Sequence, residues 1–271
     1  MKPYYEYAGI TIWHGSCIDV MPLLPAGTID LVFTSPPYNL GNTTGGGFPD
    51  RFGHYRKSSG IAKRGGQGKW AKASAAGGLA HGYGVYDDNM PHEDYVAWQG
   101  AVLNNCWRLL TDSGAIFYNH KPRVLDGKLV SPSEYIPDSL RNFVRQEIIW
   151  KRSGGINFSP AFYLPMHERI SVIAKRDFRL KSKGASGVGD VWDEHQETNS
   201  AHPAPFPIGL PARAIETTAP DLTLDPFMGS GTTLRAAKDA GRRAIGIEIE
   251  ERWCEMAVRR LEQEILPLVM A

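Results

Sequence analysis

Residues 222–250 read LTLDPFMGSGTTLRAAKDAGRRAIGIEIE, and this stretch decides the fold class of the 271-residue chain. A short apolar strand leads into the turn PFMGSG, the turn opens a helix, and the apolar strand RRAIGIEI follows, with a long helix from Glu251. Strand, helix and strand in this order are typical of a parallel βαβ unit. Further strands are expected at ITIWH, IDLVFTS, AIFYNH, QEIIWKR and RISVIAKR, and a helix over Tyr95–Leu110, ended by TDSG. The sequence predicts an α/β fold with a mostly parallel sheet.

The turn between that strand and helix is expected to bind a ligand. Gly229 and Gly231 allow close approach to the backbone, and the helix N-terminus offers free N–H groups. Leu234 stands where a dinucleotide fingerprint has its third glycine, which disfavours a dinucleotide. Asp225 is expected to face the cleft, where a carboxylate repels pyrophosphate and suits an ammonium group. Glu248, 23 residues further on, ends the next strand and suits ribose hydroxyls. These features favour S-adenosylmethionine; a turn that only packs helix on strand is the alternative.

A second strand ends in FTSPPYN at residues 33–39. Proline cannot donate to a sheet ladder, so the strand must stop there. The Ser35 hydroxyl oxygen and the Pro36 carbonyl are able to accept both hydrogens of a planar amine, because Pro37 has no N–H to compete for that carbonyl. Tyr38 offers a flat face on which an extruded base can stack. Alone, the motif would be read as a rigid turn; beside the ligand-binding turn, it favours chemistry.

Two segments depart from the strand and helix pattern. Residues 41–91 are predicted to form a DNA-binding insertion, because residues 41–84 hold thirteen glycines and residues 51–72 hold seven cations with no acid. The seven cations are Arg51, Arg56, Lys57, Lys63, Arg64, Lys69 and Lys72. Residues 176–201 are expected to form an irregular connection that aids target recognition. The net charge of +1 excludes a polycation, so nucleic-acid binding needs such a local patch.

The remaining composition indicates a cytoplasmic protein. No leader-like segment or long apolar run is present in the sequence, so we expect no membrane partner. Cys17, Cys106 and Cys254 are widely spaced and are expected to be reduced thiols; with the histidines they form no zinc pattern, and no metal is expected.

Three motifs together resemble the β class of DNA amino-methyltransferases. TSPPYN at 34–39 comes first, HPAPFP at 202–207 follows, and DPFMGSGTT at 225–233 comes late, in the circularly permuted order of that family. The resemblance covers nearly the whole chain outside the glycine-rich segment. It implies one catalytic domain over residues 1–271, with a Rossmann-like S-adenosylmethionine-dependent methyltransferase fold and a seven-stranded, mostly parallel sheet. It also implies a bacterial, archaeal or phage origin, double-stranded DNA as partner, and leaves a homodimer open.

The resemblance also implies site residues. The catalytic set is Ser35, Pro36, Pro37 and Tyr38. The cofactor set is Asp225, Pro226, Phe227, Gly229, Ser230, Gly231, Thr232, Glu248, His202, Pro203, Phe206, Ser16 and Cys17. One departure is that Ser16 replaces the acid that the family usually has after the first strand. His167 and Glu168 match a family position, and either a packing role or a site role is open.

The implied reaction is direct methyl transfer from S-adenosylmethionine to an exocyclic amine, leaving S-adenosylhomocysteine. Within the resemblance, serine in the first motif position favours cytosine N4 and aspartate favours adenine N6, although Ser35 suits either base. Cytosine ring-carbon methylation is disfavoured because no cysteine has the required context. A nucleotide-dependent oxidoreductase, a catalytically silent DNA-binding module and a protein-amide methyltransferase are the alternatives from other classes.

Overall fold

A computed structural model describes residues 2–39, 89–125, 127–152, 163–195 and 206–263. The main sheet and a small hairpin contain β1 (Tyr5–Tyr7), β2 (Ile10–His14), β3 (Ile29–Thr34), β4 (Leu110–His120), β5 (Arg123–Leu125), β6 (Lys128–Val130), β7 (Val144–Lys151), β8 (His167–Ala174), β9 (Val191–Asp193), β10 (Leu222–Asp225) and β11 (Arg243–Glu248). The helices are α1 (Cys17–Val20), α3 (His92–Leu109), α4 (Asp138–Arg141), α5 (Gly209–Thr218), α6 (Thr232–Asp239) and α7 (Glu251–Glu262), with 3-10 turns η1 (Met21–Leu23), η2 (Pro132–Tyr135) and η3 (Gly184–Val188).

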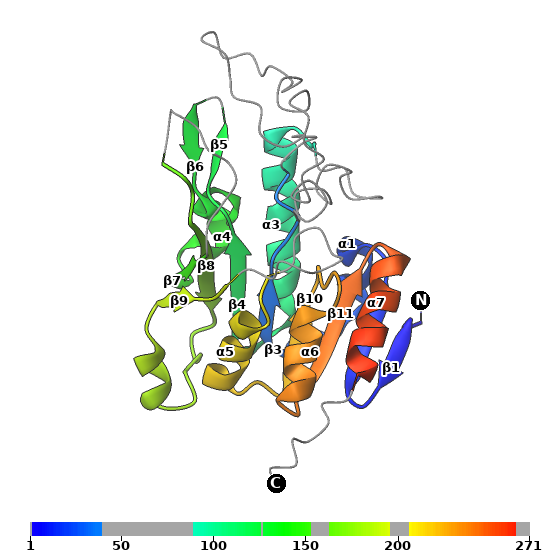
Figure 1. The fold of residues 1–271 in the computed structure, drawn as a ribbon. Coiled ribbons are helices and arrows are strands. Elements are labelled where there is room, and N and C mark those ends of the chain that lie inside the picture. Colours follow the sequence, from blue (N-terminus) through cyan, green and yellow to red (C-terminus); the bar gives the residue numbers. More distant parts are fainter. Residues whose placement is uncertain (1, 40–88, 126, 153–162, 196–205, 264–271) are drawn as a thin grey trace, which may run out of the picture.

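The main sheet is mixed but mostly parallel (Figure 1). Its strand order is β1-β2-β11-β10-β3-β4-β8-β7-β9. The five strands from β2 to β4 are mutually parallel, whereas β8 is antiparallel to both β4 and β7. The seven expected strands are all present, and the expected α/β class is confirmed. The expected count was wrong, because β1 and β9 extend the described sheet to nine strands and are too short, at three residues each, to show a periodic pattern.

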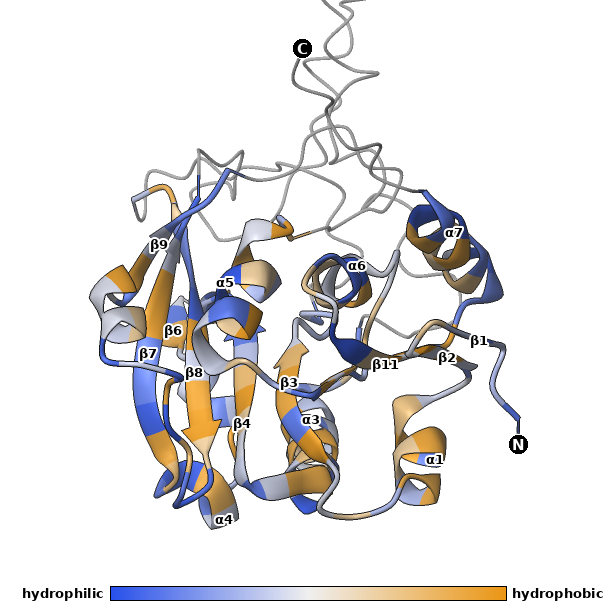
Figure 2. Cartoon of the chain, turned by 90° about the horizontal axis from the view of Figure 1, so that it is seen from below, coloured by the Kyte–Doolittle hydropathy of each residue, from blue (hydrophilic) through white to orange (hydrophobic). Residues whose placement is uncertain are grey.

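Helices cover both faces of the sheet, as the end-on view in Figure 2 shows. Helices α5, α6 and α7 pack on one face around a core that includes Phe33, Phe117 and Leu234. Helices α1 and α3 pack on the other face around a second core that includes Val32, Leu103 and Ile116. Alternate residues of the central strands enter opposite cores, and both faces of these strands are therefore apolar.

Two local expectations need correction. TDSG, residues 111–114, does not separate α3 from the next strand; it lies inside β4 as an irregularity, since Ile29 pairs with Leu110 and Leu31 already pairs with Ala115. Residues 176–201 are not wholly irregular, because β9 pairs in parallel with β7. Trp192 of β9 is buried and draws this short strand onto the sheet.

The hairpin β5–β6 extends beyond the carboxyl edge of the parallel strands (Figure 1). Val124 and Leu129 pair across the hairpin and are 49% and 65% exposed, so this ribbon presents apolar side chains to solvent. Arg123 and Lys128 belong to the same two strands. A ribbon with cations and exposed apolar groups therefore lies at the edge where β3 and β4 end.

Candidate active site

The carboxyl ends of β3 and β10 lie side by side. The two strands are parallel neighbours, and Val32 pairs with Leu224. The Thr34 hydroxyl donates to Asp225 Oδ1 at 3.0 Å. This bond joins the first residue of TSPPYN to the first residue of DPFMGSGTT. The two motifs, far apart in the chain, therefore meet at one edge of the sheet, where α/β proteins bind ligands.

Asp225 is fully buried, and donors of the chain hold both carboxylate oxygens. Besides Thr34, the Phe227 N–H donates to Oδ1 at 3.1 Å, and the Thr233 hydroxyl donates to Oδ2 at 2.7 Å. Burial raises the pKa of Asp225 to about 6, against the opposing effect of these hydrogen bonds. The expectation of a carboxylate facing an open cleft was wrong, because the two threonines and the turn enclose it.

Glu248 ends β11 next to the glycine turn. Its Oε2 accepts from the Gly229 N–H at 3.1 Å, and its Oε1 accepts from the Glu250 N–H at 2.8 Å. Burial raises the pKa of Glu248 to about 7, and the nearby Glu250 adds to the effect. Each oxygen keeps a further lone pair, so the carboxylate is able to accept two more hydrogen bonds.

Ser16 and Cys17 follow the neighbouring strand β2. The Gly15 N–H donates to the Glu248 carbonyl at 2.8 Å, which brings this turn to the same edge. Ser16 is half-buried and precedes α1, and its side chain makes no capping hydrogen bond. Burial raises the pKa of the Cys17 thiol to about 12, so Cys17 is a neutral packing group.

The glycines of the turn have reasons internal to the fold. Gly231 has φ +80°, and a Cβ there would lie 2.9 Å from Ala257 Cβ on α7. Gly229 has φ 50° and donates its N–H to Glu248. The sequence analysis expected both glycines to allow ligand approach and kept a packing role of the turn as the alternative, and packing against Ala257 accounts for Gly231.

Aromatic rings flank the turn on both sides of the sheet. Phe227 lies 5.4 Å from the Trp98 ring of α3, and Phe206 lies 5.5 Å from Phe33 of β3, both as centroid distances. Phe206, expected in the cofactor wall, is buried against the core. Of the other expected cofactor residues, Pro226, Ser230 and Thr232 are buried, and His202 and Pro203 lie outside the described residues.

The polar side chains of FTSPPYN enter a short hydrogen-bonded chain. The Ser35 and Tyr38 hydroxyl oxygens are 2.6 Å apart, and the Tyr38 hydroxyl donates to Glu168 Oε2 at 2.7 Å. Glu168 belongs to β8 and is buried, and its Oε1 pairs with Arg152 Nη1 at 2.9 Å. The site therefore contains an ion pair behind the motif.

Asn119 is a site residue that the sequence analysis missed. It is fully buried at the end of β4, and its Nδ2 lies 2.8 Å from Glu168 Oε2, 2.9 Å from the Tyr38 hydroxyl and 3.2 Å from Ser35 Oγ. The available signal was the polar pair Asn119-His120, which ends an apolar strand at the same edge as Ser35. The structure brings Ser35, Tyr38, Asn119 and Glu168 together.

The Tyr38 ring packs against a buried aromatic cluster. Its centroid lies 4.6 Å from that of His120, and Lys121 Nζ lies 5.8 Å from it. Burial lowers the pKa of His120 to about 3, so its ring is neutral. The Tyr95 hydroxyl of α3 donates to the Pro37 carbonyl at 2.8 Å and fixes the turn. The stacking role of Tyr38 stays a prediction.

Asn39, the last residue of the motif, is hydrogen bonded to Met90, which precedes α3. Its Nδ2 donates to the Met90 carbonyl at 2.8 Å, and its Oδ1 accepts from the Met90 N–H at 2.7 Å. Asn39 has φ 52°, a left-handed conformation that asparagine tolerates. The seven cations expected to bind DNA, residues 51–72, lie outside the described residues.

Comparison with known proteins decides the family. The family model described as DNA methylase, whose name covers N6 and N4 enzymes, matches residues 29–259 of this chain. The chain belongs to this DNA methylase family. The type II methyltransferase M.ScaI of Streptomyces caespitosus is 26% identical over 299 residues, which span 97% of this chain and 84% of that protein. The expected family of DNA amino-methyltransferases is confirmed.

Solved structures share the fold of this methylase. The cytosine-N4-specific PvuII DNA methyltransferase superposes with a TM-score of 0.68 at 17% identity, covering 98% of this chain and 90% of that one. A DNA modification methylase of Thermus thermophilus, solved with S-adenosylmethionine, gives a TM-score of 0.56 at 20% identity, covering 93% and 94%. S-adenosylmethionine is the cofactor of the family, as expected from the sequence.

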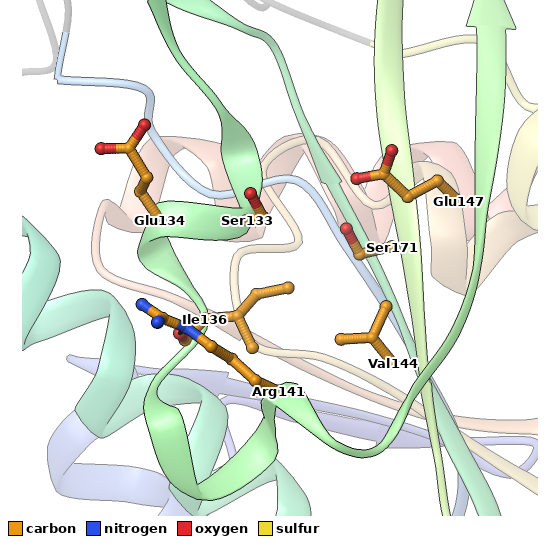
Figure 3. Close-up of a pocket in the computed structure, with 7 residues that line it drawn as sticks. All are labelled: Ser133, Glu134, Ile136, Arg141, Val144, Glu147 and Ser171. Carbon is orange, nitrogen blue, oxygen red and sulfur yellow. Dashed lines mark hydrogen bonds between the residues drawn. The ribbon is translucent and has the colours of Figure 1, made fainter.

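A cleft of about 380 Å³ lies elsewhere in the methylase (Figure 3). It opens between η2, α4 and the strands β7 and β8, and its lining is Ser133, Glu134, Ile136, Arg141, Val144, Glu147 and Ser171. None of these belongs to the motifs, and Ser171 pairs with Tyr118 in mid-strand, away from Ser35. Within the described ranges, no cluster of His, Cys, Asp or Glu suited to a metal ion occurs, and no helix is long and apolar enough to span a membrane.

Proposed function

We propose that this methylase transfers the methyl group of S-adenosylmethionine to N4 of a cytosine extruded from duplex DNA. One observation carries the proposal: Ser35 stands at the carboxyl edge, joined through Thr34 to the late motif by the hydrogen bond to Asp225. Among the described residues, no donor hydrogen bonds the Pro36 carbonyl, which is thus available to an amine. Ser35 Oγ and this carbonyl would accept the two amine hydrogens.

The amine needs this help because its lone pair is delocalised into the base. Accepting both N–H bonds returns electron density to nitrogen as it becomes tetrahedral. Bound S-adenosylmethionine supplies the electrophilic methyl group. Tyr38 would stack on the base, and the turn that Tyr95 fixes at Pro37 would hold the two acceptors in place. The serine favours cytosine, although relatives named as adenine and as cytosine-N4 enzymes both match this chain.

The late motif fits the cofactor. Asp225, which is buried, and Glu248, which is half-buried, stand at the turn, and carboxylates there would repel a pyrophosphate and favour hydroxyl or cationic donors. Glu248 keeps lone pairs for ribose hydroxyls. We also propose that S-adenosylmethionine contacts Ser16, Cys17 and the turn residues Pro226 to Thr232.

Changing Glu248 should weaken cofactor binding without unfolding the protein. Glu248→Ala is expected to raise the Kd for S-adenosylmethionine roughly tenfold or more, through ~1–3 kcal/mol of lost charge-assisted hydrogen bonding. Glu248→Gln should also lose affinity, because both oxygens accept backbone N–H groups and an NH₂ group would face one of them. Calorimetry on folded variants measures the effect, with the exposed Glu255→Gln of α7 as control. Unchanged affinity in both Glu248 variants would mean that the ribose lies elsewhere.

DNA is proposed to bind across the carboxyl edge, held by the basic segment and by the hairpin β5–β6. Lys128 of the hairpin and Lys121 beside Tyr38 are cations of the described part near this edge, whereas the Arg123 guanidinium packs over the Tyr95 ring with its Nη1 buried. By contrast, the exposed cations of residues 176–183 lie at the opposite edge, because the Lys175 and Asp177 N–H groups donate to Gly114 and Asp112 at the start of β4.

Neutralising the basic segment should flatten the salt dependence of DNA binding. Replacing Lys63, Arg64, Lys69 and Lys72 with glutamine is expected to reduce the slope of log K against log salt by up to ~0.9 for each phosphate that the protein no longer neutralises. The matched variant replaces Arg176, Arg179, Lys181 and Lys183, an equal charge change at the opposite edge. Fluorescence anisotropy at several salt concentrations gives both slopes. A larger change in the matched variant would move the DNA surface to residues 176–183.

Identification of the methylated base tests the function directly. Genomic DNA lacking the modification is incubated with the protein and S-adenosylmethionine, digested to nucleosides and analysed by mass spectrometry, with S-adenosylhomocysteine in place of the methyl donor as control. N4-methylcytosine supports the proposal. N6-methyladenine would keep the reaction class and refute the cytosine assignment, and no methylated nucleoside would refute the proposed function. Long-read sequencing of the same DNA identifies the recognition sequence.

A further inference from the structure

The hydrogen-bonded chain behind Ser35 has only one possible direction. Glu168 is a carboxylate paired with Arg152, and an ionised carboxylate accepts hydrogen bonds but donates none. The Tyr38 hydroxyl therefore donates its single hydrogen to Glu168 Oε2, at 2.7 Å. The 2.6 Å contact between Tyr38 and Ser35 must then be donated by Ser35. The Ser35 oxygen is left to face the base with lone pairs alone.

Asn119 supports this direction. Its NH₂ group, not its oxygen, faces Glu168 Oε2 at 2.8 Å, because two acceptors would repel each other. The same NH₂ group lies 2.9 Å from the Tyr38 hydroxyl oxygen and 3.2 Å from Ser35 Oγ. Asn119 Oδ1 is buried without a hydrogen-bond partner among the described residues. Leaving Asn119 Oδ1 unpaired costs free energy, so the Glu168 carboxylate strongly determines the orientation of the Asn119 amide.

We propose that Glu168 is a specificity-determining residue that makes this site admit amino bases and reject oxo bases. Because Glu168 fixes Ser35 as an acceptor, an exocyclic amine meets two acceptors, Ser35 Oγ and the Pro36 carbonyl. An exocyclic carbonyl, as in uracil or thymine, would meet the same two oxygens and find no donor. The inference rests on the proposed function, since it assumes that the target base lies against Ser35.

Two variants should loosen the discrimination by different routes. Glu168→Gln offers an NH₂ group that is able to donate to Tyr38 and to the unpaired Asn119 oxygen, so the whole chain of hydrogen bonds is free to reverse and Ser35 to donate. Tyr38→Phe keeps the ring and the ion pair of Glu168 with Arg152 but removes the link, which also frees the Ser35 hydrogen. The Pro36 carbonyl stays an acceptor in both, so some preference for the amine remains.

The test measures binding rather than methylation. Duplexes carry the recognition sequence found by sequencing, with cytosine or uracil at the target position opposite an abasic site, so that both bases leave the stack with equal ease. Anisotropy in saturating S-adenosylhomocysteine gives the ratio of the two Kd values. Wild type is expected to prefer cytosine by on the order of 100-fold, and each variant by roughly tenfold or less.

The controls separate this effect from general damage. Glu147→Gln breaks the ion pair with Arg169 between β7 and β8, and Tyr5→Phe removes a tyrosine hydroxyl at the far edge of the sheet. Both should keep the wild-type ratio, and circular dichroism confirms that each variant is folded. A wild type that binds both duplexes equally, or Glu168 and Tyr38 variants that keep the full preference, would overturn the inference. Failure of the proposed function looks different, since wild type would then yield N6-methyladenine or no methylated nucleoside.

Discussion

Replacing Ser35 with alanine should lower kcat by ~10²–10³-fold, the loss typical of removing one preorganised hydrogen bond to developing charge. The hydroxyl oxygen contributes most as nitrogen becomes tetrahedral, so the Kd for S-adenosylmethionine and for DNA should change by less than about twofold. Single-turnover methylation with tritiated cofactor measures the chemical step, and equilibrium binding measures the affinities.

Ser139→Ala is the matched control, because this exposed serine of α4 contacts Asn104 and lies outside both motifs. Wild-type kcat in Ser35→Ala would refute the acceptor role. A loss confined to DNA affinity would instead make Ser35 a binding residue of the turn.

Replacing Asp225 with alanine should destabilise the fold by ~3–4 kcal/mol, because the Phe227 N–H and two threonine hydroxyls lose a buried acceptor. Asp225→Asn is expected to cost less than half as much, since the amide oxygen still accepts from Thr34 and Phe227, while Thr233 turns to accept from the NH₂ group. Urea unfolding of the cofactor-free protein measures both. If Asp225→Ala unfolds like wild type but no longer binds S-adenosylmethionine, the carboxylate is a ligand of the cofactor rather than a support of the turn.

The wild type and Asp225→Asn should differ in the pH dependence of their unfolding free energy. The pKa of Asp225 is raised from 3.8 to about 6 in the fold, so the folded protein binds this proton more tightly than the unfolded chain. Its contribution, about 3 kcal/mol, is full below pH 4 and is lost as the pH rises through 6. Asp225→Asn removes this titration, and its unfolding free energy should vary less between pH 4 and 7. An equally steep dependence in the asparagine variant would assign the titration to Glu248.

The sequence predicted the central strands and the meeting of the two motifs, because these depend on local patterns. IDLVF and LTLD are short apolar runs that end in turn residues, and parallel strands bring such ends together. The edge strands β1 and β9 were not predicted, because strands of three residues show no periodic pattern. TDSG was not predicted as part of a strand, because its strand conformation depends on pairing with β3 rather than on its own composition. Register is a property of two strands, and neither one alone contains it.

The site was predicted in part. Ser35 and Asp225 were found because each lies in a motif, but the surroundings of Asp225 were misread, since the two threonines that enclose it have no distinctive pattern in the sequence. Asn119 of β4 and Arg152, one residue beyond β7, were missed because each acquires its role only across the sheet. The direction of the hydrogen bonds behind Ser35 depends on Ser35, Tyr38 and Glu168, and no local spacing in the sequence relates Tyr38 to Glu168, 130 positions further on.

Two hydrogen bonds between Asn39 and Met90 hold the residues that flank the intervening chain, so that changes in that chain need not alter the catalytic edge. Where the two ends of a segment are fastened to each other, the closure entropy of what lies between grows only slowly with its length. Residues could be added or removed there with little displacement of Tyr38 or of the start of α3. The DNA-binding role that we propose for residues 41–91 can therefore vary with the composition of that segment while the chemistry at Ser35 stays as it is.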